Sequence, residues 1–61
     1  MILRTAVLLE PGTQIQLDAG PPWTVMGIRP SGDRIAVDLY NDDDQKMGLR
    51  IFPGDLVEIV F

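Results

Sequence analysis

Polar and apolar residues alternate along most of this chain, and the alternation has a period of two. Side chains of one kind then occupy every second position, as in a β-strand that buries one face. In segment 23–29 the phase changes at Gly27, where a β-bulge would restore the register. The pattern predicts five strands, in segments 13–17, 23–29, 34–40, 47–52 and 56–61.

Turn-forming residues separate these segments at short and even intervals. The clusters are Pro11-Gly12, Gly20 to Pro22, Pro30 to Asp33, Asn41 to Asp44 and Pro53-Gly54. No segment between them shows helical periodicity over two turns. Short, closely spaced strands suit a strongly bent antiparallel sheet that closes on itself and so removes its free edges. We therefore expect an all-β fold, a small five-stranded barrel that forms a single domain over residues 1–61.

The register of the last hairpin follows from keeping inward residues opposite one another. Val37 then pairs with Leu49, and residues 41–45 form a loop with Tyr40 opposite Lys46. In the N-terminal segment, the same alternation turns Leu3, Val7 and Leu9 inward and Ile2, Ala6 and Leu8 outward. At the other end it turns Phe61 inward. The expected core is Ile15, Leu17, Val25, Ile28, Ile35, Val37, Leu39, Leu49, Ile51, Val57 and Ile59.

Three consecutive aspartates, Asp42 to Asp44, lie in the predicted loop. A calcium loop needs alternating oxygen ligands, a glycine and a distant bidentate glutamate. Here the acids are contiguous, no glutamate follows, and Lys46 is close by. Asn and Asp also favour turns, because they tolerate left-handed backbone and bond to nearby main chain. We expect a solvated turn without a specific metal, the alternative being an acidic tip that faces a partner.

The composition disfavours catalysis. The chain has no histidine and no cysteine, so disulfides, thiolate ligands and an imidazole base are all excluded. Ser31 has nothing to activate it and lies in an ordinary turn. We expect no catalytic residue and no cofactor.

Apolar residues are more abundant than so small a core can hold. They make up 46% of 61 residues, and a domain of this size buries only about 60% of the surface of its unfolded chain. Apolar side chains on both faces of a strand indicate burial on both faces. We therefore expect a protein partner or self-assembly, through an interface formed by Ile2, Leu8, Phe52, Leu56 and Val60.

Net charge bears on nucleic-acid binding. At −4 the chain disfavours a polyanionic partner. The predicted register places Arg29, Arg34 and Arg50 on one outer face, where Asp33 and Asp38 are expected to neutralise them. A nucleic-acid-binding barrel is the alternative, and it requires these arginines to form one face that is not neutralised.

The two large amphipathic aromatic residues suggest a further candidate site. Trp23 and Tyr40 lie near hairpin bases and could line a ligand groove. The other interpretation is that Trp23 closes one end of the barrel and its indole N–H bonds to a carbonyl.

Membrane insertion and export are not indicated. No apolar run reaches the roughly 20 residues of a membrane span. The segment "MILRTAVLLEPG" lacks a small-residue cleavage site. We expect a cytoplasmic protein.

Several motifs resemble those of known small barrels. The segments "LEPGTQIQL", "WTVMGIRPSGDRIAVDL" and "FPGDLVEIV" resemble SH3-like barrels, in particular small uncharacterised proteins of actinobacteria and their phages. The likeness covers about residues 8–61. It implies an SH3-like fold and a genomic setting, not an activity. We expect a phage-encoded accessory or regulatory protein that docks on a host or virion protein or self-assembles, located in the host cytoplasm or the virion.

A second resemblance is to the carbon storage regulator family of RNA-binding dimers. That family starts similarly and has a hairpin similar to "TVMGIRPSGDRIAVDL". Its RNA-contacting segments differ from "ILRTAV" and "FPGDLVEIVF", so only Arg4 could carry over as a contact. This family is disfavoured.

Overall fold

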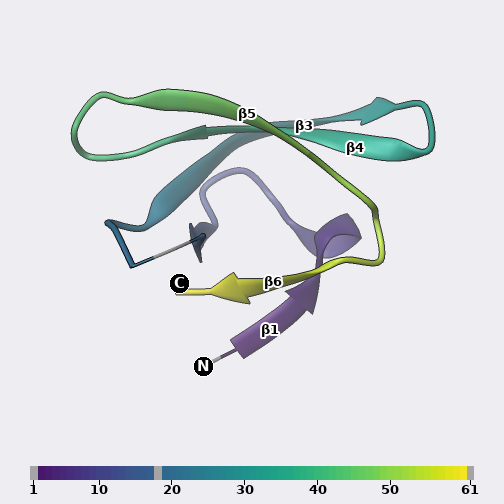
Figure 1. The fold of residues 1–61 in the computed structure, drawn as a ribbon, viewed down its shortest axis with the longest axis horizontal. Coiled ribbons are helices and arrows are strands. Elements are labelled where there is room, and N and C mark those ends of the chain that lie inside the picture. The colour runs from purple at the N-terminus through teal and green to yellow at the C-terminus, as the bar shows by residue number, and fades with distance from the viewer. Residues whose placement is uncertain (1, 18, 61) are drawn as a thin grey trace.

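Antiparallel strands build the whole sheet of the computed structural model, which describes residues 2–17 and 19–60. In these ranges six strands follow the order β1-β6-β2-β3-β4-β5 (Figure 1). The elements are β1 (Ile2–Thr5), the 3-10 helix η1 (Ala6–Leu8), β2 (Gln14–Gln16), β3 (Trp23–Ser31), β4 (Arg34–Tyr40), β5 (Lys46–Ile51) and β6 (Leu56–Ile59). The prediction of an all-β fold is confirmed.

The barrel closure that we predicted is not confirmed. Each of the five predicted segments overlaps one strand, but β1 is added beside β6, so the sheet has six strands. The sheet ends at β1 on one side and at β5 on the other, and it stays open. Two strand edges are therefore free, where closure would have left none.

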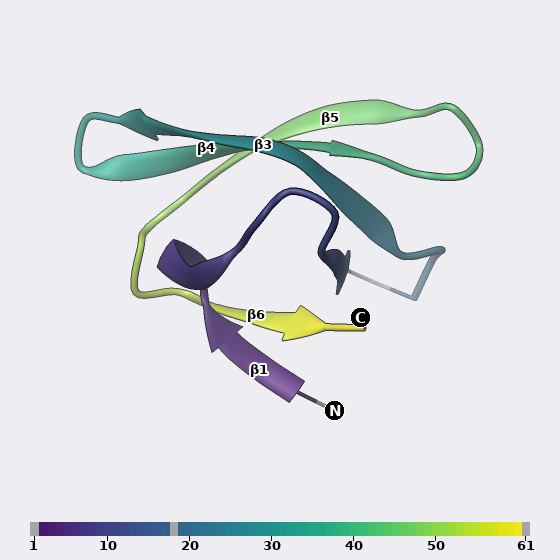
Figure 2. The same ribbon diagram turned by 180° about the vertical axis from the view of Figure 1, so that it is seen from behind.

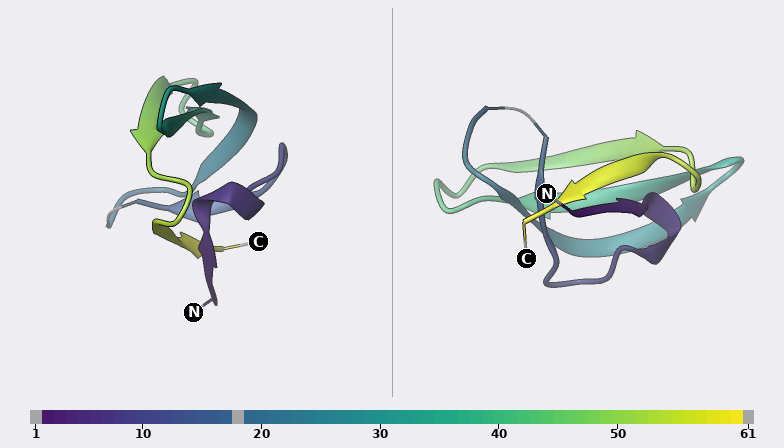
Figure 3. Two further views of the ribbon diagram at one scale, coloured as in Figure 1. Left: turned by 90° about the vertical axis from the view of Figure 1, so that its right-hand side faces the viewer. Right: turned by 90° about the horizontal axis from the view of Figure 1, so that it is seen from below.

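The sheet folds over itself into two layers. β3, β4 and β5 form one layer, and β6 and β1 lie across from them in the other (Figures 1 and 2). β2 connects the layers, because it pairs with both β3 and β6. The pairing of β3 with β4 shifts between Val25 and Gly27, which confirms the predicted bulge. A bulge bends its strand and increases the local twist, and the left view of Figure 3 shows β3 as a strongly curved strand.

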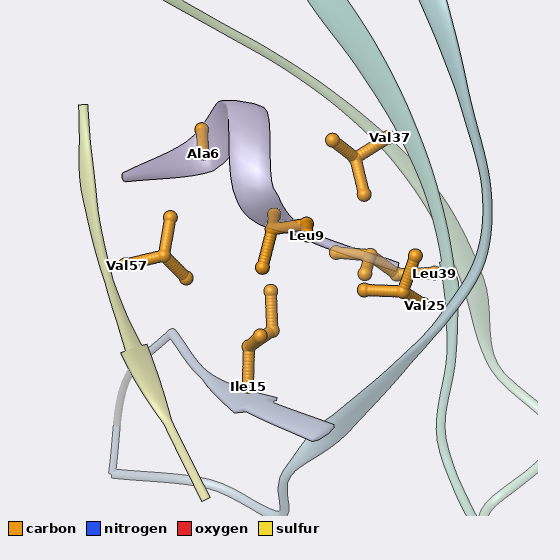
Figure 4. Close-up of a cluster of buried hydrophobic side chains, with 7 residues drawn as sticks. All are labelled: Ala6, Leu9, Ile15, Val25, Val37, Leu39 and Val57. Atoms are coloured by element: carbon orange, nitrogen blue, oxygen red, sulfur yellow. The ribbon is translucent and has the colours of Figure 1, made fainter. Parts of the chain in front are cut away.

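The core lies between the two layers (Figure 4). Ala6, Leu9, Ile15, Val25, Val37, Leu39 and Val57 are buried in it. Most of the predicted core is either in this cluster or packed partly buried against it. Leu17 is an exception, with 38% of its surface exposed. β2 ends at Gln16, so Leu17 lies beyond the strand and no longer follows the alternation that would place it inward.

The N-terminal alternation predicted the wrong inward residues. Leu9 is buried as expected, but Leu3 and Val7 are 52% and 62% exposed, and Ala6 is completely buried. The cause is η1, which replaces the strand period with a tight turn closed by the Leu9 N–H donating to the Ala6 carbonyl (3.1 Å). The Ala6 N–H donates to the Asp55 carbonyl (2.8 Å), which holds Ala6 under the turn before β6. Phe61 lies outside the described residues.

The β4–β5 hairpin has the expected register, whereas the turn between β3 and β4 is shorter than the predicted Pro30 to Asp33, because β3 continues to Ser31. Val37 pairs with Leu49, and Tyr40 lies opposite Lys46, as predicted. In the β3–β4 hairpin Ser31 pairs with Arg34, which leaves a two-residue turn with φ of +66° at Gly32. Glycine at the first central position with positive φ is the signature of a type II′ turn, whose twist matches that of the flanking strands.

Candidate functional site

The aspartate loop is organised by Asn41, which is only 4% exposed. Its side-chain Oδ1 accepts hydrogen bonds from the N–H groups of Asp43 and Gln45, both at 3.0 Å. Its Nδ2 donates to Gln45 Oε1 at 2.8 Å. Asp44 adopts a left-handed φ of 60°, which aspartate tolerates. The prediction that this segment is a turn is confirmed, and Asp42 to Asp44 are exposed.

Metal ligands do not gather in the part of the chain that the structure describes. No group of three or more acidic, histidine or cysteine side chains in residues 2–17 and 19–60 is placed to hold an ion. The same residues include no helix long and apolar enough to cross a bilayer. The remaining candidates are surfaces rather than chemical centres.

One candidate surface is the free edge of β1. The Val60 N–H, just after β6, donates to the Gln14 carbonyl of β2 (2.8 Å). In an antiparallel strand the backbone N–H and C=O groups of successive residues point to alternate sides. Those of Val57 and Ile59 therefore point toward β1, where these residues pair with Arg4 and Ile2. The backbone N–H and C=O groups of Leu3 and Thr5 then point away from the sheet. This edge is open to another strand.

Exposed apolar side chains surround this edge on both faces. Leu56 is 65% exposed and Val60 36%, and both fall on the outer phase of β6 together with Leu3 of β1. Ile2, 56% exposed, shares the inner face with its partner Ile59. We call this surface the terminal patch, and it consists of Ile2, Leu3, Leu8, Leu56 and Val60.

A groove of about 180 Å³ continues the terminal patch on the inner side. It lies between β1 and the segment after η1, and Leu8, which is 60% exposed, contributes to its wall beside Arg4 and Ile59. Four of the five predicted interface residues therefore lie at one end of the sheet. Phe52 is on a different surface, where the Arg34 guanidinium carbon is 4.6 Å from the centre of its ring.

The opposite edge of the sheet, β5, is protected. The Asn41 N–H donates to the Gln45 carbonyl (3.1 Å), so the alternation turns the backbone groups of Lys46, Gly48 and Arg50 outward. Charged side chains on an edge strand discourage pairing with another chain. β5 carries two of them, whereas β1 carries only Arg4. The two free edges are thus chemically different.

A second candidate surface covers the outer side of β3, β4 and β5. Four of the chain's five basic residues project from it: Arg29, Arg34, Lys46 and Arg50. Asp38 is the acidic residue of the strands on this side, and its Oδ1 is 3.5 Å from Arg29 Nη2. We call this surface the basic face, and it consists of Gly27, Arg29, Arg34, Ala36, Asp38, Tyr40, Lys46, Gly48 and Arg50.

Asp33 and Asp38 were expected to neutralise the three arginines. Asp38 forms its ion pair with Arg29, and the side chains of Asp38 and Arg29 are 43% and 69% exposed. Arg34 lies over the ring of Phe52. An ion pair this exposed is weak. With four basic residues and one acid, the strands of this face keep a charge of about +3.

Trp23 and Tyr40 do not lie on one surface. Trp23 is opposite the buried Ile15 in the β2–β3 pair and packs partly buried against the core. Tyr40 is opposite Thr24, the next residue along β3, and is 40% exposed. Neighbouring residues of a strand point to opposite faces. Trp23 therefore belongs to the inner face and Tyr40 to the basic face.

Comparison with known proteins does not indicate a function for either surface. No protein-family model matches the chain, and no match was found among curated proteins or solved structures. The function has to be argued from the residues themselves.

Proposed function

We propose that this protein is a non-catalytic interaction module that assembles with a second copy of itself through the terminal patch. The observation that carries the proposal is the edge of β1. No strand of the described residues lies beside its outward backbone groups, and apolar side chains lie exposed on both of its faces. Addition of a strand satisfies such an edge with main-chain hydrogen bonds, while the flanking side chains are buried on either side.

The register of the pairing follows from the charges. Two copies of β1 that meet across a two-fold axis can pair Leu3 with Leu3, or can be centred on Arg4. The second arrangement would place two guanidinium groups directly opposite each other, which is destabilising. Pairing through Leu3 puts Arg4 of each copy opposite Ile2 of the other. The outward N–H and C=O groups of Leu3 then bond reciprocally.

The size of the molecule is compatible with this interface. A stable complex of standard size buries about 800 Å² on each partner, roughly a fifth of the 4124 Å² that this protein exposes. Removing apolar surface from water contributes roughly 25 cal/mol per Å² before the cost of association is subtracted. The terminal patch lies on both faces of the sheet at the β1 edge, so a strand added at that edge contacts part of the patch on each face.

As part of this proposal we relate the fold to SH3-like barrels, because the open sheet has a similar order of strands. It keeps a three-stranded meander, β3-β4-β5, folded over a final strand that returns beside β2. In this view β1 occupies the side of β6 at which a closed barrel would continue.

The oligomeric state in solution tests the proposal. We expect light scattering after size-exclusion chromatography to give twice the chain mass of 6.8 kDa. Leu56→Asp combined with Val60→Asp should give a folded monomer, since both side chains are exposed. Met26→Asp is the matched control, because Met26 is 48% exposed but lies in β3, and it should leave the dimer intact. A parent protein that stays monomeric at hundreds of micromolar would rule out self-assembly.

A further inference from the structure

The basic face has an ordered arrangement of charges. Arg29, Ala36 and Arg50 lie in one row across β3, β4 and β5. Adjacent strands are about 4.8 Å apart, so the two arginines leave the sheet roughly 10 Å from each other with only a methyl group between them. Arg34 projects from the same side of β4, two residues before Ala36. Three guanidinium groups thus surround one end of this face.

The next row is almost bare. Gly27 and Gly48 lie on either side of Asp38. Neither glycine has a positive φ, and a Cβ atom at Gly27 would meet nothing within 4 Å. A Cβ atom at Gly48 would meet only Asp38 Oδ1, at an ordinary 3.9 Å. Glycine within a strand weakens it and often marks a bulge, as at Gly27, or close approach of another molecule. Neither the backbone conformation nor the packing of the described residues requires glycine at these two positions.

Exposed aromatic rings complete the surface. Tyr40 is 40% exposed at one end of the face, and Phe52, 45% exposed, lies beside Arg34 at the other. Exposed aromatic rings favour ligands with flat rings, because the two can stack on each other.

The overall negative charge does not cancel this surface. The thinnest dimension of the molecule is 18 Å, whereas electrostatic interactions in physiological salt are screened over about 8 Å. Acidic residues on the far side therefore have little effect at the arginines. The exceptions are the aspartate loop, Asp42 to Asp44, which follows Tyr40 directly, and Asp33, which lies in the turn beside Arg34. The three charges of the loop repel a polyanion from the Tyr40 end, whereas at the other end Arg29, Arg34 and Arg50 outnumber the single charge of Asp33.

We propose that the basic face binds single-stranded nucleic acid. Phosphates contact Arg29, Arg34 and Arg50, and bases lie over the bare backbone of Gly27 and Gly48 and the methyl group of Ala36, or stack on the rings of Phe52 and Tyr40. A flexible strand suits an open sheet face, because its bases can be splayed onto it. This site is separate from the terminal patch and does not depend on self-assembly.

Fluorescence anisotropy with a labelled twelve-nucleotide oligo(dT) or oligo(U) tests the charges. Each phosphate contact on a single strand contributes about −0.7 to the slope of log K against log salt. We expect a slope of about −2 for the parent, and of about −0.7 for Arg29→Gln combined with Arg50→Gln. Arg4→Gln is the matched control, since Arg4 is on β1, and it should leave slope and affinity unchanged. Absence of binding at 20 mM salt, or an equal effect of Arg4→Gln, would overturn the proposal.

A second set of variants tests the base contacts. Gly48→Val keeps the charge but covers the bare backbone, and Phe52→Ala removes a stacking ring. Each should weaken binding about tenfold. Gly48→Val should do so without lowering the melting temperature, because valine favours strands, and a purely structural role for Gly48 would lower it. Oligoglutamate of the same length should compete poorly. If it competes as well as the oligonucleotide, or if neither variant alters affinity, the ligand is an acidic protein segment and the proposal is wrong.

Discussion

Asn41 provides the sharpest test of how the structure is stabilised locally. Replacing it with alanine removes three hydrogen bonds of 2.8–3.0 Å, two of which satisfy the N–H groups of Asp43 and Gln45. A hydrogen bond contributes about 0.5–1.5 kcal/mol net, and water can replace part of this loss at an exposed turn. We therefore expect Asn41→Ala to lower the free energy of unfolding by about 2 kcal/mol. In a domain of this size the melting temperature then falls by roughly 8–16 °C.

The neighbouring aspartates are the controls for this experiment. Asp42, Asp43 and Asp44 changed together to Asn should leave the melting temperature nearly unchanged, with or without calcium, because their side chains are exposed. Asn41→Asp keeps an acceptor for the two N–H groups but loses the donor to Gln45, so its effect should be intermediate. Circular dichroism melts of the four proteins measure the differences. If the triple variant is destabilised as much as Asn41→Ala, the role assigned to Asn41 is wrong.

Other variants test the core, the turn and the edge. Val37→Ala, at a position with no exposed surface, should lower the free energy of unfolding in urea by about 2–4 kcal/mol, through the cavity that it leaves. Gly32→Ala forces an alanine to φ near +66° and should cost about 1–2 kcal/mol in the same assay, with Gly32→Asn costing less. Leu3→Pro removes only an outward N–H, so light scattering should show a monomer. Its melting temperature should match that of the Leu56→Asp, Val60→Asp variant. A Leu3→Pro dimer would exclude pairing through β1.

The sequence pattern predicted the β4–β5 hairpin well because its geometry is local. Only one register of β4 and β5 keeps all of their inward residues opposite one another, so the pairing of Val37 with Leu49 could be worked out in advance. The bulge at Gly27 was visible as a change of phase within a single strand. Arg29 and Arg50 could be placed on one face for the same reason.

The features that were missed depend on distant contacts. Ala6 is buried because its N–H and that of Val7 donate to carbonyls of Asp55 and Pro53, about fifty residues away, and no local pattern encodes this. The same contacts stop the strand alternation after Thr5. Whether a bent sheet closes depends on where its two end strands lie in space. The partner of Asp38 depends on side-chain conformations, so the register alone could not choose between Arg29 and Arg50.

The pairing of β1 with β6 has a consequence for the order of folding. Residues 2–5 pair with residues 56–59, whereas β3, β4 and β5 are joined by short turns and can form early, because they close only small loops. The edge of β1 is held in place only when almost the entire described chain has already folded. A nascent or partly unfolded chain would therefore expose Ile2 and Leu3 without a strand that positions them. Native-state hydrogen exchange should reveal this as early opening of the amides of β1 and β6, while those of the meander stay protected. Assembly through β1 would then act as a check on completed folding.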